Sequence, residues 1–141
     1  MQTMSTLHIN AHSLQQIIDH AVLGYPYEVC GLAGGQAGRV EVVTQIPNAS
    51  LTPLVSFEME RQAMVDVIMG FQRAGREVVA VYHSHPNEEA IPSQRDIAQA
   101  TWPDAIYIIV GLHDLSAPVV RAWTVRREFA EPIEAEIVIV D

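Results

Sequence analysis

The sequence predicts a single α/β (α+β) domain in which helices flank a central mixed β-sheet. Apolar residues recur with helical spacing in some segments and alternate as in strands in others. The two kinds of segment interleave along the chain without a strict strand–helix–strand repeat. The chain has 141 residues, a length that suits one domain, so we assign 1–141 to it and expect residues 1–6 to be a flexible N-terminus.

Two amphipathic helices are expected at 12–23 and 60–74, because apolar residues recur there every three or four positions. A shorter helix should begin after Pro92, with Ser93 near its N-cap. Apolar or alternating runs indicate strands at 7–10, 25–35, 39–47, 55–59, 77–82, 105–111, 119–125 and 137–140. The run 105–111 is expected at the centre of the sheet and the run 137–140 at an edge.

Charge and composition exclude several classes of protein. The 8 basic and 17 acidic residues give a net charge of −9, so neither nucleic acid nor an anionic membrane surface is an expected partner. No segment approaches the roughly 20 apolar residues of a membrane helix. Cys30 is the only cysteine, and the N-terminal residues lack the basic start and apolar run of a signal peptide. A cytoplasmic protein is therefore expected.

The strongest chemical pattern consists of His83, His85, Ser93 and Asp96. The two histidines continue a predicted strand, where alternate side chains share a face, so they form half of a metal site. Asp96 can supply a third ligand from the helix that follows. Three protein ligands and one open position are what a catalytic zinc requires. Taken alone, Ser93 reads as an ordinary N-cap and Asp96 as a first-turn acid, so the joint pattern carries the hypothesis.

Other residues carry weaker hypotheses. Glu28 lies in an apolar run, and its local sequence favours an exposed carboxylate on a half-buried strand; with a metal site elsewhere, it becomes a general-base candidate. Cys30 is interpreted as a small buried residue. Glu88 and Glu89 could be extra ligands, but a surface pair is favoured because a fourth protein ligand would displace the catalytic water. His113 is expected in a turn.

Together these residues resemble the JAMM (MPN-plus) metalloprotease family. The family signature is an upstream Glu, then His-Ser/Thr-His-Pro, a spacer and Ser-x-x-Asp. This chain carries Glu28, the runs 83–86 and 93–96, and seven residues between His85 and Ser93. The resemblance, closest to short stand-alone bacterial members, implies a fold similar to that of cytidine deaminases, with a mixed sheet between helices.

The resemblance also implies roles. His83, His85 and Asp96 would bind one Zn²⁺ per chain, Glu28 would act as base and then acid, and Ser93 would stabilise the oxyanion. The implied enzyme is a zinc metallopeptidase or isopeptidase acting after the C-terminal Gly-Gly tail of a ubiquitin-like or sulfur-carrier protein. An exposed strand edge could bind that tail. The family often dimerises, which leaves a homodimer open. The alternatives are a non-catalytic MPN scaffold and a zinc amidohydrolase of a small substrate.

Overall fold

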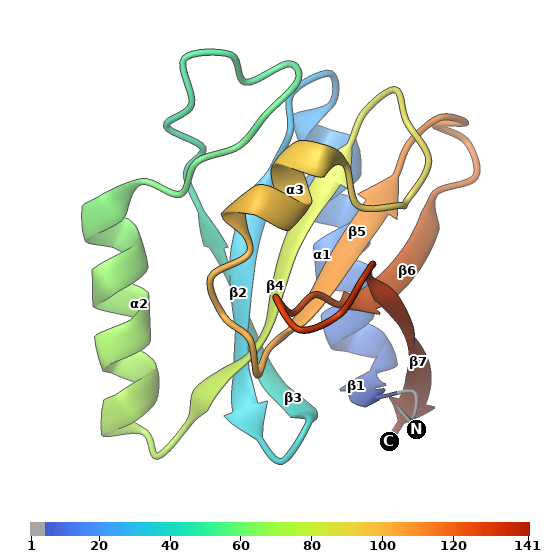
Figure 1. Cartoon of the computed structure of the whole chain (residues 1–141). Coiled ribbons are helices and arrows are strands. Elements are labelled where there is room, and N and C mark those ends of the chain that lie inside the picture. Colours follow the sequence, from blue (N-terminus) through green and yellow to red (C-terminus); the bar gives the residue numbers. More distant parts are fainter. Residues whose placement is uncertain (1–4) are drawn as a thin grey trace.

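The architecture comes from a computed structural model that describes residues 5–141 (Figure 1). Within this range the chain forms three helices and seven strands. In chain order they are β1 (Thr6–Asn10), α1 (Ala11–Gly24), β2 (Cys30–Gln36), β3 (Arg39–Ile46), α2 (Arg61–Arg73), β4 (Glu77–His85), α3 (Gln94–Gln99), β5 (Ile106–Gly111), β6 (Val119–Thr124) and β7 (Ile133–Val140). No helix among these residues is long and apolar enough to cross a membrane.

The strands form one mixed sheet, which confirms the predicted fold class. Their order is β1-β3-β2-β4-β5-β6-β7, and the order closes because β7 also pairs with β1. The pairs β4–β5, β1–β3 and β1–β7 are parallel, whereas the other neighbouring pairs are antiparallel. Gly111, the last residue of the buried strand β5, lies opposite His85 in the register with β4.

The prediction of an edge strand at 137–140 is wrong. β7 begins at Ile133, pairs with β6 on one side and runs parallel to β1 on the other, from Thr6↔Glu136 to Asn10↔Val140. The partner strand lies at the opposite end of the sequence, so the local pattern could not reveal it. Although the order closes, β1 and β3 share only the pair His8↔Arg39, so most of β3 pairs with β2 alone.

The strand expected at 55–59 is also wrong. This segment is a loop that pairs with the rest of the chain only through an isolated bridge between Asn48 and Met59. The Asn48 side chain occupies the backbone groups that a ladder would use: its Nδ2 donates to the carbonyl of Ser56, and its Oδ1 accepts from Glu58 N, each at 3.0 Å. An Asn side chain can thus replace strand pairing in an extended loop.

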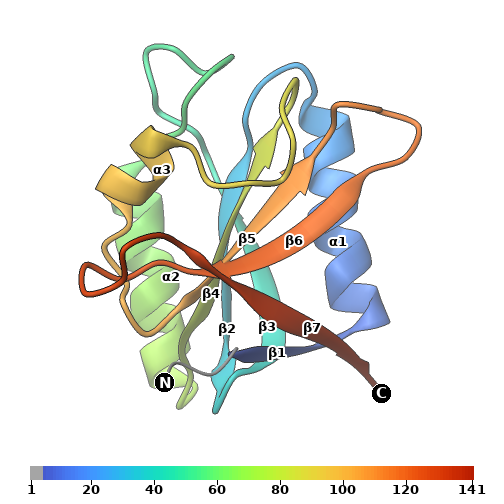
Figure 2. The same cartoon turned by 45° about the vertical axis from the view of Figure 1, so that its right-hand side comes forward.

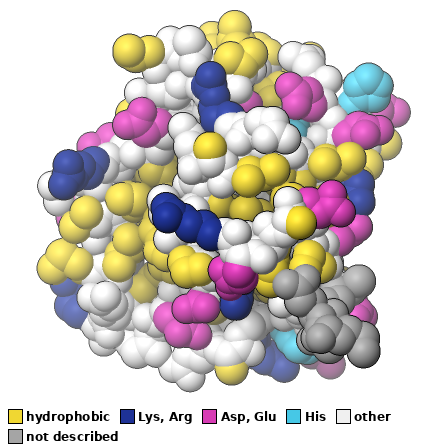
Figure 3. Space-filling view, in the orientation of Figure 1, with side chains coloured by type: hydrophobic (Ala, Val, Ile, Leu, Met, Phe, Trp, Pro, Cys, Tyr) yellow, Lys and Arg dark blue, Asp and Glu magenta, His cyan; other side chains and the backbone are white. Residues whose placement is uncertain are grey.

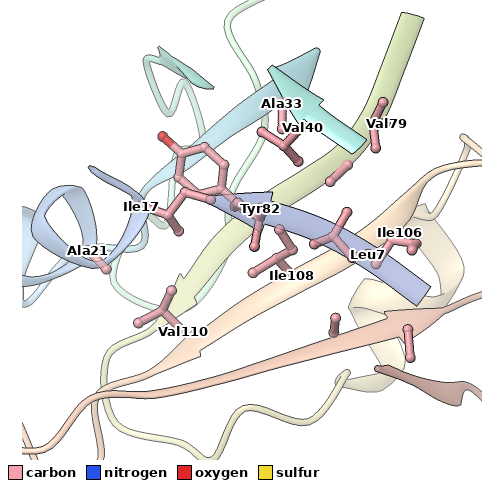
Figure 4. Packing of buried hydrophobic residues seen from close by; sticks show 14 of the residues in the cluster. Leu7, Ile17, Ala21, Ala33, Val40, Val79, Tyr82, Ile106, Ile108 and Val110 are labelled. Carbon is pink, nitrogen blue, oxygen red and sulfur yellow. The ribbon is translucent and has the colours of Figure 1, made fainter. Parts of the chain in front are cut away.

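Helices cover both faces of the sheet (Figure 2). On one side, Ile17 of α1 packs with Tyr82, Ile108 and the other residues of a buried cluster (Figure 4). On the other side, α2 and α3 cover a second cluster that contains Val81. Because side chains alternate along β4, Tyr82 faces α1 whereas residues 81, 83 and 85 face α2 and α3. Both candidate ligand histidines therefore lie on the α2–α3 side.

The flexible N-terminus expected at residues 1–6 falls mainly outside the described residues. Of the two positions that the structure describes, Thr6 begins β1, and the carbonyl of Ser5 accepts a hydrogen bond of 2.8 Å from the backbone N–H of Glu136. Thr6 also pairs with Glu136, so both residues lie where β1 meets β7.

Candidate metal centre

The carboxyl end of β4 holds His83 and His85 in a fixed backbone. His83 pairs with Cys30 of β2 and with Ile109 of β5. The carbonyl of His85 accepts a 2.9 Å hydrogen bond from the N–H of Leu112. The histidine residues are only 1% and 3% exposed, so their imidazoles have little access to water. The sheet on both sides of β4 therefore sets where these rings can point.

Asp96 reaches the same point from the first turn of α3, as predicted. Ser93 is the N-cap of this helix: its Oγ accepts from the N–H of Asp96 at 3.1 Å. In return, the N–H of Ser93 donates to Asp96 Oδ2 at 2.9 Å, which completes a capping box. The box fixes the carboxylate rotamer, so Oδ2 stays directed at β4.

Three side-chain donor atoms meet between β4 and α3. The two imidazole Nε2 atoms are 3.1 Å apart, and Asp96 Oδ2 lies 3.2 Å from His83 Nε2 and 2.9 Å from His85 Nε2. Three lone pairs so close together repel one another unless a proton or a metal ion lies between them. Two imidazoles and one carboxylate form a donor set that zinc takes in catalytic sites, so these residues fit a metal ion.

Hydrogen bonding prepares His85 to act as a ligand. Its Nδ1 lies 2.8 Å from the carbonyl oxygen of Glu89. A carbonyl can only accept, so Nδ1 carries the hydrogen, and in the neutral ring Nε2 presents a lone pair to the cluster. Burial lowers the pKa of His83. Burial would raise the pKa of Asp96, but hydrogen bonds with both histidines hold it well below its usual range. His83 and Asp96 thus favour the forms that can bind a metal. Burial would also lower the pKa of His85, but the hydrogen bonds with Asp96 and the Glu89 carbonyl outweigh burial and raise this pKa, so a metal ion has to displace a proton from this ring.

Glu28 lies just before β2, on a segment fastened to β4 by Ser84. The N–H of Val29 donates to Ser84 Oγ at 2.9 Å, and Ser84 N–H donates to the Val29 carbonyl at 3.1 Å. The Glu28 N–H also donates to the carbonyl of Pro53 at 2.8 Å. Glu28 is only 8% exposed, so the exposed carboxylate favoured by its local sequence is wrong.

The electrostatic environment of Glu28 suits proton transfer. Burial raises the pKa of its carboxyl to about 7, and the charges of Asp96 and Glu88 add to this effect while those of His85 and Arg95 oppose it. The carboxyl is therefore within electrostatic range of the cluster. A carboxyl with a pKa near neutrality can both accept and return a proton.

The weaker candidates occupy other roles. Cys30 is buried, and burial followed by the charge of Glu28 raises the pKa of its thiol to about 12, so it is not a nucleophile at neutral pH. The side chains of Glu88 and Glu89 are exposed, and Glu89 contacts the site through its backbone carbonyl. His113 lies in a bend that precedes the turn at residues 115–116.

Sequence reasoning missed two residues that shape the site. The ring of Phe57 stacks on His83, with centroids 4.5 Å apart and planes 24° apart. The Asn48 side chain donates to the Glu28 carbonyl at 3.0 Å. Asn after Pro47 signals a turn, but nothing in the local sequence connects either residue with the histidines. Only the long-range folding of the 48–59 loop brings them there.

The chain matches the family described as prokaryotic homologs of the JAB domain over residues 10–126. The chain belongs to this family. All five positions of the signature, from Glu28 to Asp96, lie inside the matched region. The protein is thus a prokaryotic JAMM/MPN domain, as the resemblance implied.

Several curated relatives of this JAMM domain are peptidases. It is 33% identical to a desampylase of Haloferax volcanii, over 76% of this chain and 81% of the relative. It is 32% identical to a probable TtuB-protein conjugate cleaving protease of Thermus thermophilus (79% and 74%). It is 30% identical to the CysO-cysteine peptidase of Mycobacterium tuberculosis (87% and 85%). The chain is a hydrolase, like these relatives.

Solved structures agree with this assignment. A protein from Desulfitobacterium hafniense superimposes with a TM-score of 0.84 at 26% identity, covering 96% of this chain and 93% of the other. A JAB1/MPN domain protein from Archaeoglobus fulgidus shares the fold, with a TM-score of 0.61 at 22% identity and coverage of 94% and 99%. The α+β architecture of the JAMM domain is thus the architecture of known JAB1/MPN structures.

Proposed function

We propose that this protein is a zinc-dependent metallopeptidase or isopeptidase. Its substrate would be the peptide or isopeptide bond that follows the C-terminal Gly-Gly tail of a ubiquitin-like or sulfur-carrier protein. The observation that carries the proposal is the convergence of His83, His85 and Asp96 within 3.2 Å of one another, with Glu28 buried in electrostatic range. The names of relatives, a TtuB-conjugate cleaving protease and a CysO-cysteine peptidase, support the substrate class.

His83, His85 and Asp96 would hold one zinc ion per chain. When bound, zinc lowers the pKa of a water molecule to about 7 and polarises the scissile carbonyl. Glu28 would accept the proton of the attacking water and deliver it to the nitrogen that leaves. An amide nitrogen leaves poorly unless it is protonated, so this transfer is needed, and such general acid–base catalysis contributes about 10²–10⁴-fold.

Ser93 would donate a hydrogen bond to the oxygen of the scissile carbonyl as negative charge develops there. Its Oγ already accepts from the N–H of Asp96, and among residues 5–141 its hydroxyl hydrogen is engaged in no other hydrogen bond. The N-cap role therefore leaves the donor free and fixes its position. Loss of one such donor typically costs about 10²–10³-fold in rate.

An apolar cavity of about 490 Å³ offers a place for the substrate beside the cluster. Phe57, which stacks on His83, and Val81, two residues before His83 on β4, both line it. Figure 3 shows hydrophobic side chains gathered on this face, over α2 and the neighbouring hollow. A Gly-Gly tail has no side chains to clash as it approaches the buried histidines, which supports this tail as the substrate.

The remaining proposals concern location and partners. With Cys30 buried and reduced, a cytoplasmic enzyme is proposed. The net charge of −9 supports a carrier partner with a basic face and disfavours nucleic acid and anionic membranes. A homodimer stays open.

The test combines metal analysis with cleavage of a carrier protein fused through its Gly-Gly tail to a reporter. We expect one zinc per chain in the wild type, loss of zinc in Asp96→Ala, and zinc without cleavage in Glu28→Ala. Glu136→Ala, which removes an exposed carboxylate on β7, is the control and should cleave normally. A zinc-free wild type would refute the proposal, and zinc-dependent hydrolysis of small amides but not of the fusion would favour an amidohydrolase.

A further inference from the structure

The loop 86–92 joins the two halves of the metal centre. It leaves β4 directly after His85 and leads directly into Ser93, the cap of the helix that carries Asp96. The Glu89 carbonyl in the middle of the loop accepts from His85 Nδ1 at 2.8 Å and also from the Ile91 N–H at 2.8 Å. The position of this one peptide therefore sets the orientation of the His85 ring.

Trp123 of β6 holds the next peptide of the loop. Its indole Nε1–H donates to the Ala90 carbonyl at 2.9 Å, and this hydrogen bond is buried. The Arg121 guanidinium lies over the indole ring, 4.8 Å from its centroid, and makes two hydrogen bonds, of 3.0 and 2.8 Å, to Glu134. A planar guanidinium held in this way restrains the indole. The donor is therefore preorganised on the sheet rather than mobile.

Gly111 of β5 lies against the same part of the loop, at Glu88 and Ala90. A Cβ at this position of β5 would lie 2.8 Å from the backbone nitrogen of Ala90 and 3.2 Å from the carbonyl oxygen of Glu88. The loop thus rests on the backbone of β5, at the residue that pairs with His85. A side chain on Gly111 would have to displace backbone, not a flexible side chain. Trp123 and Gly111 therefore act from two strands on the consecutive peptides on either side of Ala90.

We propose that Trp123 is a positioning residue for the metal ligand His85. By holding the Ala90 carbonyl, it keeps the adjacent Glu89 carbonyl against His85 Nδ1–H, so that His85 Nε2 faces His83 and Asp96. The importance of this hydrogen bond for metal binding rests on the proposed function, whereas the orientation of the ring does not. Partners that orient a ligand imidazole typically change metal affinity by about 10–100-fold when they are removed.

The test is Trp123→Phe, which keeps an aromatic ring and removes the N–H donor. Zinc affinity is measured by competition with a chromogenic chelator, and we expect it to fall by about 10-fold. In parallel, the Nδ1–H resonance of His85 is followed by NMR in the metal-free protein, where we expect faster exchange with water. Trp102→Phe is the matched control, because no hydrogen bond of the Trp102 indole is found among residues 5–141; both readouts should stay at wild-type values.

Gly111→Ala provides a second variant that leaves Trp123 intact and displaces the loop. If Trp123→Phe fails to fold, as judged by circular dichroism, Gly111→Ala decides, and it should weaken zinc binding and speed exchange at His85 Nδ1. Wild-type zinc affinity and wild-type exchange in the folded variants would overturn the proposal. If the wild type itself binds no zinc, the proposed function fails, and the exchange rate at His85 Nδ1 alone still decides whether Trp123 positions the ring.

Discussion

The burial of Glu28 affects both the stability of the fold and the ability of this carboxyl to take up a proton. Its backbone N–H and carbonyl are engaged by Pro53 and Asn48, so the residue cannot swing into water without breaking hydrogen bonds. The carboxylate thus stays desolvated, which is why the pKa is raised to about 7. A residue that is costly to ionise in the folded protein is, for the same reason, able to take up a proton near neutral pH.

This cost predicts a specific pH dependence for the metal-free protein. The pKa of Glu28 rises from 4.5 to about 7 on folding, so the folded state binds the proton more tightly. Its contribution to stability is complete below about pH 4.5 and is lost as the pH rises through 7, a loss of about 2–3 kcal/mol. Urea unfolding at pH 5 and pH 8 should show that Glu28→Gln lacks this loss. If the free energy of unfolding changed equally between the two pH values in wild type and Glu28→Gln, the raised pKa would not belong to Glu28. Glu136→Gln is the control and should behave like the wild type.

At the scale of elements, α3 combines a helix cap with a proposed metal ligand. The helix has only six residues, and its capping box joins Ser93 to Asp96. Such a short helix has little stability of its own, so the cap and the contacts with β4 hold it in place. The same hydroxyl that caps the helix is proposed as the oxyanion donor, and the two roles can be separated by substitution.

Ser93→Ala and Ser93→Gly separate these roles. Alanine is a poor N-cap and should cost about 1 kcal/mol of stability, whereas glycine should cost only a few tenths. Both variants lack the hydroxyl, so both should cleave the carrier fusion about 10²–10³-fold more slowly. Urea unfolding and cleavage rates measured on the same preparations make the comparison. A wild-type rate in Ser93→Gly would leave Ser93 as a cap alone.

At the scale of the whole molecule, the sequence predicts the features that depend on neighbouring residues and misses those that depend on contacts between residues far apart in the chain. The strand that leads into His83 and His85 and the cap at Ser93 depend on neighbouring residues, so the convergence of these side chains with Asp96 could be predicted from the sequence. The burial of Glu28 depends on the 48–59 loop, and the closure of the sheet depends on pairing between residues near opposite ends of the chain. Pairings of this kind follow from global packing and leave little trace in local pattern.

The metal should act on the whole fold, because its ligands come from separate elements. The three donor atoms lie within 3.2 Å of one another, and an ion between them would tie β4 to α3. Zinc at 100 times its dissociation constant should stabilise the folded state by about 2.7 kcal/mol, which corresponds to a rise in Tm of roughly 5–10 °C. Differential scanning calorimetry with and without zinc measures this rise. Mg²⁺, which prefers oxygen ligands, should produce no shift, and neither should zinc with Asp96→Ala. An equal rise in wild type and Asp96→Ala would place the ion elsewhere.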